Sequence, residues 1–80
     1  MSTELRNDAK RQITRSLQEH GYPTYASLLM PFDIYLTDNP EVIGYMLPSK
    51  AKIVLNKYLS ESQVSTIVRH EIMHEYLIHA

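Results

Sequence analysis

The C-terminal segment of the chain, from residue 60 onward, constrains the fold most, because it combines a long helix pattern with many ionisable side chains. Ser60 is a typical N-cap residue, and Gln63 three positions later completes a capping-box sequence. The sequence therefore predicts a helix from Glu61 to at least Leu77. Its apolar residues spread round most of the circumference, which predicts a helix buried inside the fold. They are Val64, Ile67, Val68, Ile72, Met73, Tyr76, Leu77 and Ile78.

Ionisable side chains in a buried helix need partners or a metal ion, because an isolated buried charge is costly. The chain has 80 residues, enough for one domain. It contains no cysteine, which excludes disulfides, thiolate zinc sites, iron–sulfur clusters and thiol catalysis. A metal would need His, Asp or Glu ligands, and three of the four histidines lie in the last eleven residues.

The first thirty residues predict mainly helix. One narrow apolar stripe recurs every four residues, so residues 3–20 are predicted as a helix on the outside of the fold. The stripe consists of Leu5, Ala9, Ile13 and Leu17. Gly21 and Pro23 end this helix. Residues 22–30 are interpreted as a short helical turn.

Three strands are predicted in the middle of the chain. Phe32–Thr37 alternates apolar and polar residues, which indicates a half-buried strand. Val42–Leu47 and Lys52–Leu55 are separated by a short turn and predict a hairpin. Gly44 indicates a bulge or a close approach of the backbone to another element. The predicted fold class is α+β, with an N-terminal helix, a mostly antiparallel three-stranded sheet and the C-terminal helix against one face.

Residues 70–74 read His-Glu-x-x-His on the predicted C-terminal helix. Side chains four residues apart lie about 5–6 Å apart on one helix face, so His70 and His74 can reach one zinc ion at roughly 2.0–2.1 Å. Glu71 leaves the helix about 100° further round, where it can act as general base toward a metal-activated water. With this composition, the pattern arises by chance in roughly 1–2% of chains. The competing interpretation is two solvated surface histidines.

The stretch Ile43–Ala80 resembles the SprT-like and minimal gluzincin metallopeptidases of the zincin clan. Residues 51–56, Ala-Lys-Ile-Val-Leu-Asn, resemble the strand end that precedes the active-site helix in SprT-like chains, and residues 64–74 resemble that helix. The resemblance covers the second half of the chain well and the first forty residues only in outline.

The resemblance implies a zincin-like zinc-dependent peptidase that hydrolyses peptide bonds in protein or peptide substrates. Zn²⁺ is the implied cofactor, His70 and His74 are the implied zinc ligands, and Glu71 is the implied general base. In zincins an edge strand above the active-site helix pairs with extended substrate. Val42–Leu47 is the candidate for this substrate-binding strand. The alternative, that it is an ordinary strand of the sheet without a role in binding, is equally favoured. No individual substrate-binding residue is assigned.

A catalytic zinc site takes three protein ligands, and the motif supplies two. In the resembling families the third ligand lies well downstream, so we expect a single zincin-like domain that is an N-terminal fragment of a longer chain, with the third ligand beyond Ala80. His79 is a weaker candidate, because it lies about 140° from the face of His74 in a continuous helix. His20 is a remote one. These residues alone are expected to bind zinc weakly and to show little or no peptidase activity.

Other residues near the motif have simpler interpretations. Glu75 would orient an imidazole or be solvated, and solvation is favoured. Tyr76 would donate to an oxyanion or pack in the core, and packing is favoured. Arg69 is interpreted as a surface charge or as the partner of an acidic residue. The alternative function is a catalytically inactive zincin-like binding or regulatory module, which the missing third ligand favours and the complete motif disfavours.

The remaining expectations concern partners and location. The net charge is −1, which predicts no nucleic-acid surface. No apolar run approaches the ~20 residues of a membrane span, and the N-terminus lacks the apolar segment of a secretory signal. The chain is therefore expected in the cytoplasm. Exposed apolar helix surface in a truncated domain would permit an oligomer.

Overall fold

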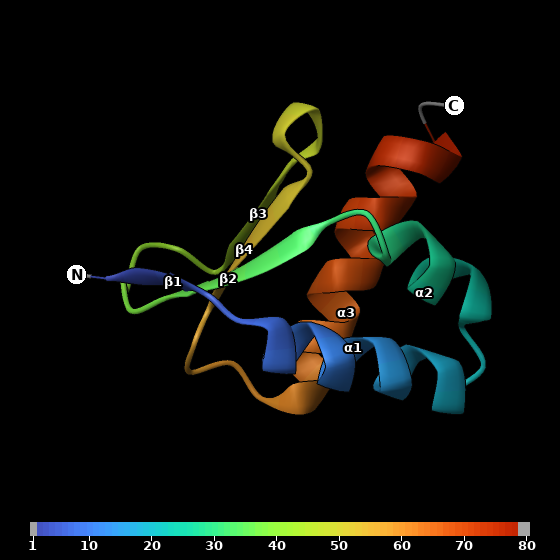
Figure 1. The fold of residues 1–80 in the computed structure, drawn as a ribbon, viewed down its shortest axis with the longest axis horizontal. Helices are drawn as coiled ribbons and strands as arrows, with labels where there is room; N and C mark the ends of the chain where they lie inside the picture. The colour runs from blue at the N-terminus through green and yellow to red at the C-terminus, as the bar shows by residue number, and fades with distance from the viewer. Residues whose placement is uncertain (1, 79–80) are drawn as a thin grey trace.

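The computed structural model describes residues 2–78 as one α+β arrangement (Figure 1). The elements in chain order are β1 (Thr3–Leu5), α1 (Asn7–Glu19), α2 (Pro23–Leu29), β2 (Asp33–Thr37), β3 (Gly44–Leu47), the 3₁₀ turn η1 (Pro48–Lys50), β4 (Lys52–Asn56), α3 (Glu61–Ile72) and the π-helical segment η2 (Met73–Ile78). The predicted α+β class, the short second helix and the three central strands are confirmed.

The four strands form one mixed sheet in the order β1-β2-β4-β3. The hairpin of β3 and β4 is antiparallel, as predicted. At the centre, β2 and β4 run parallel, with Asp33 beside Lys52 at one end and Thr37 beside Asn56 at the other. The parallel pair requires a crossover, which the β3 hairpin arm and its preceding loop provide.

The predicted count of three strands is wrong. Thr3–Leu5, expected as the start of the first helix, form the edge strand β1 antiparallel to β2. The Ser2 N–H donates to Asp38 Oδ1 at 2.8 Å, and the Arg6 N–H donates to the Ile34 carbonyl at 2.8 Å. These bonds join residues about thirty positions apart, which a local periodicity does not reveal, and helix α1 begins only at Asn7.

The helices cover one face of the sheet. α3 contacts α1, α2 and β3, and α1 also contacts β2 (Figure 1). The core lies between the helices and this face, and its fully buried large side chains are Leu17, Leu29, Phe32, Ile34, Ile53, Leu55, Val68 and Ile72. Burial of each such side chain contributes about 1.5–3 kcal/mol. Alternation along the strands then directs the intervening side chains to the opposite face of the sheet.

That opposite face carries one apolar row across the four strands. In strand register, Leu5 lies beside Tyr35, Tyr35 beside Val54, and Val54 beside Tyr45. We call these four residues the open-face row. Val54 is buried within it, Tyr35 is half-buried, and the Lys52 ammonium lies 4.6 Å from the centre of the Tyr35 ring. The row ends at the sheet edge with Tyr45.

The edge strand β3 lies directly against α3. A β-carbon on Gly44 would lie 2.9 Å from Cγ2 of Ile67 and 3.0 Å from Cδ2 of Leu55. Real β-carbons essentially never come so close to another atom, so the strand reaches this position because residue 44 has no side chain. The predicted close backbone approach at Gly44 is confirmed.

Asn56, the last residue of β4, holds the loop that leads into β3. Its amide nitrogen Nδ2 donates to the carbonyls of Asn39 and Val42 at 3.0 and 2.9 Å. Its Oδ1 accepts from the Tyr58 N–H at 2.9 Å. One side chain therefore fixes the chain on both sides of the hairpin. Among the described residues, no helix has the length and apolar character needed to cross a bilayer.

Candidate metal centre

Helix α3 presents the His-Glu-x-x-His residues, and its first turn is built as the sequence predicts. The Gln63 N–H donates to Ser60 Oγ at 3.3 Å, and the Ser60 N–H donates to Gln63 Oε1 at 2.9 Å. This reciprocal capping box gives a side-chain acceptor to two backbone N–H groups at the start of the helix, those of Ser60 and Gln63. Further along, Val68 and Ile72 are fully buried and fix the rotation of the helix on the core.

The expectation that α3 is buried all round is wrong. His70, His74 and Glu75 are exposed, and Glu71 is half-buried. The helix packs on α1, α2 and β3 along one side, and its ionisable residues lie on the remaining side. Because these side chains contact water, their charged forms avoid the desolvation cost that a buried charge would have.

The structure brings His70 and His74 together. Their ring centroids are 4.6 Å apart, with the ring planes inclined at 73°. Two imidazoles that share one tetrahedral zinc ion, each at about 2.0–2.1 Å from its nitrogen, have ring centres about 5 Å apart. The observed separation fits that requirement. Neutral imidazole nitrogen is also a preferred donor for zinc, so the donor chemistry fits as well.

A third ligand does not join this pair within residues 2–78, where no group of three His, Cys, Asp or Glu side chains is placed to hold a metal ion. His20 caps the end of α1, with its Nδ1 2.8 Å from the Ser16 carbonyl oxygen. His79 and Ala80 lie outside the described residues. Within residues 2–78 the structure therefore brings together two candidate ligands, one fewer than the three protein ligands that a catalytic zinc site takes.

The helix changes geometry at the motif. From Met73 to Ile78 it continues as the π-helical segment η2, which begins immediately before His74. Short π-helical segments are rare and frequently occur at functional sites. The prediction that the helix continues to at least Leu77 is confirmed, whereas its change of type was not expected from the sequence.

The neighbouring residues have structural roles. The ring of Tyr76 packs edge-to-face on Phe32, with centroids 6.1 Å apart, so the favoured packing interpretation is confirmed. The Arg69 guanidinium lies 4.3 Å from the centre of the Tyr22 ring, and its Nε donates to the Ser65 carbonyl at 3.3 Å. Arg69 therefore links α3 to the segment between α1 and α2.

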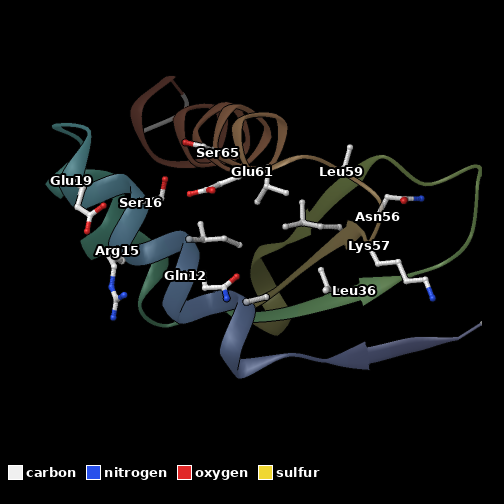
Figure 2. Close-up of a pocket in the computed structure, with 14 residues that line it drawn as sticks. Gln12, Arg15, Ser16, Glu19, Leu36, Asn56, Lys57, Leu59, Glu61 and Ser65 are labelled. Carbon is white, nitrogen blue, oxygen red and sulfur yellow. The ribbon is translucent and has the colours of Figure 1, made fainter.

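A cavity of about 480 Å³ lies at the other end of α3 (Figure 2). Apolar side chains of α1, β2, β4 and α3 form its floor, and charged side chains stand at its rim. The floor includes Ile13, Leu36, Leu55 and Val64, and the rim includes Arg15, Glu19, Lys57 and Glu61. The last residue of α3 that lines the cavity is Ser65, five residues or about 7.5 Å of helix before His70, and neither His70 nor His74 lines it. This cavity, which no sequence motif indicated, is therefore separate from the histidine pair.

An ion pair lies at the start of α1. Arg6 donates to both carboxylate oxygens of Asp8, at 2.9 and 2.7 Å. The hydrogen bond from Arg6 lowers the pKa of Asp8 to about 2. The pair joins Arg6, which lies between β1 and α1, to the first turn of α1.

No family model, curated protein or solved structure matches the chain. The class assignment of this protein therefore depends on its own residues and their geometry.

Proposed function

We propose that this chain is a zinc-binding domain of a zincin-type metallopeptidase, with His70 and His74 as zinc ligands and Glu71 as the general base. The 4.6 Å separation of the two imidazole rings on the exposed side of a capped helix is the observation that carries the proposal. The site's ionisable residues are accessible to both an ion and a substrate.

Zn²⁺, when bound, would supply Lewis-acid polarisation of a peptide carbonyl and of the attacking water. The Glu71 carboxylate accepts one proton from that water and later transfers it to the leaving amine nitrogen. Its half-buried position beside the exposed His70 lets it reach solvent while the helix restrains its direction. A third protein ligand completes such a site, and the two other histidines of this sequence are His20 and His79.

In the proposed reaction, β3 holds the substrate in extended form beside α3. β3 is an edge of the sheet, and Gly44 brings it into contact with Ile67, three residues before His70. An extended peptide can add to such an edge through main-chain hydrogen bonds. A peptide paired there would run along the helix that carries the two histidines.

A zinc titration tests the metal site. Isothermal titration calorimetry would compare the wild type with H70A, H74A and, as a matched control, H20A. We expect the wild type and H20A to bind one Zn²⁺ with equal affinity, and each of the other two variants to lose at least about tenfold. Equal affinity in all four proteins would remove the metal site and with it the proposed function.

A cleavage assay tests the general base. Fluorescently labelled unfolded casein would be incubated with zinc-loaded wild type and with E71Q. We expect E71Q to keep its zinc affinity and to lose about 10²–10⁴-fold in turnover. Undiminished cleavage by E71Q would eliminate Glu71 as the base.

The lack of a third ligand within residues 2–78 favours one second candidate, a catalytically inactive zincin-like binding or regulatory module. Zinc binding without any casein cleavage by the wild type would support this candidate over the peptidase.

A further inference from the structure

The two edges of the sheet differ in their chemistry. Edge strands are usually protected by charged side chains or proline. The β1 edge follows this rule, because Glu4 lies within it and Arg6 follows it directly. Over residues 42–47, by contrast, the β3 edge carries no charged residue, and Pro48 follows it directly.

Large apolar side chains are instead exposed at the β3 edge. Ile43 is 66% exposed and Tyr45 is 42% exposed. An uncharged edge with exposed apolar side chains is a ready template for another strand. The fold thus has, beside α3, an uncharged strand edge with exposed apolar side chains, where proline protects only the C-terminal end.

The backbone of β3 is oriented to receive that strand. The Asn56 N–H donates to the Ile43 carbonyl at 3.0 Å, so Ile43 and Asn56 are a hydrogen-bonded pair. Hydrogen-bonded and non-bonded pairs alternate along an antiparallel ladder. In register with β4, this alternation directs the N–H and C=O groups of Gly44 and Met46 away from β4, toward the open edge.

The side chains of an added strand would then divide between the two faces. Met46 belongs to the core on the helix side, whereas Tyr45 ends the open-face row on the other side. Alternate residues of the added strand would extend that row and lie against Tyr45, where cross-strand apolar pairs stabilise a sheet. The intervening residues would lie on the side of α3.

We propose that β3 selects extended peptides with large apolar side chains at alternate positions, and that Tyr45, supported by Ile43, is the residue that determines this specificity. The inference rests on the proposed function for the substrate role of β3, and it names the substrate class.

The test measures peptide binding rather than cleavage, in a zinc-loaded chain carrying E71Q. One probe is an acetylated heptapeptide in which phenylalanines alternate with threonines between terminal lysines, and the matched probe has serines in place of the phenylalanines. Backbone amide chemical shifts would report both the affinity and the location of binding. We expect the phenylalanine peptide to bind about five- to tenfold more tightly, with shifts concentrated at residues 43–47.

Single substitutions then identify the residue that determines the affinity ratio of the two peptides. Y45T keeps a strand-forming side chain but should reduce the affinity ratio to about twofold, and I43T should reduce it by a smaller factor. Y58T is the matched control, because Tyr58 is 77% exposed and lies outside β3. It should leave the ratio unchanged.

The outcomes separate this inference from the proposed function. Equal binding of the two peptides, an unchanged ratio in Y45T, or shifts outside β3 would overturn the inference, even if the wild type cleaves casein. Selective binding at β3 by a chain that cleaves nothing would support the inference while the peptidase fails. Analytical ultracentrifugation at the same concentration would measure the oligomeric state. A dimer in which a second copy of the chain occupies β3 would overturn the inference.

Discussion

Gly44 of the edge strand and Ile67 of helix α3 meet so closely that a β-carbon on the glycine would lie 2.9 Å from Cγ2 of the isoleucine. The position of β3 relative to the histidine pair therefore depends on a missing side chain. Because Ile67 precedes His70 by one helical turn, this contact sets how near a peptide on β3 comes to the candidate zinc ligands.

The first prediction concerns that contact. G44A should lower the free energy of unfolding by about 1–2 kcal/mol, because overpacking outweighs the smaller gain in backbone entropy. Urea denaturation would measure the change. In an I67A background, which removes the clashing methyl group, the cost of G44A should fall by about 1 kcal/mol. A cost that is the same in both backgrounds would mean that the contact is not the cause.

A second prediction concerns the loop that leads into β3. N56A removes two donors to the carbonyls of Asn39 and Val42 and one acceptor for the Tyr58 N–H. We expect a loss of about 1–3 kcal/mol in the free energy of unfolding. N56D keeps the acceptor but places a carboxylate against two carbonyls, so it should be at least as destabilising. Wild-type stability in N56D would show that the two donated bonds contribute nothing.

Zinc should stabilise the chain against thermal unfolding. At pH 7.5 a hundredfold excess of Zn²⁺ over its Kd should add about 2.7 kcal/mol of stability and raise Tm, and EDTA should reverse the increase. Calorimetric scans of wild type, H70A and H74A would check this. A zinc-dependent rise in Tm that persists in H74A would place the ion elsewhere.

The Arg6–Asp8 pair gives a prediction at acid pH. Asp8 has a folded-state pKa of about 2, below its ordinary value of 3.8, so its carboxylate form is favoured by folding. The resulting stabilisation is fully present above pH 3.8 and disappears as the pH falls toward 2. R6A should raise the Asp8 pKa toward its ordinary value, as measured by an NMR titration of the carboxyl carbon. An unchanged pKa would show that the hydrogen bond is not its cause.

Short-range patterns predicted several elements correctly. The hairpin of β3 and β4 follows from two apolar runs with a short turn, and the capping box at Ser60 places the start of α3 within a residue. The predicted first helix begins too early, at residue 3 instead of Asn7. Leu5 continues the apolar stripe of α1, but the same residue is equally compatible with a strand. Only the pairing of Leu5 with Tyr35 decides between these two conformations.

The sequence by itself determined the His70–His74 relationship, since residues four apart on a helix are neighbours whatever the helix packs against. The tertiary structure decided that this pair faces water, because the core of α3 is formed by Val68 and Ile72 against distant strands and helices. It also decided the parallel pairing of β2 with β4 and the place of β3 at an edge of the sheet. These features arise from contacts between residues far apart in the chain, for which no local pattern carries a signal.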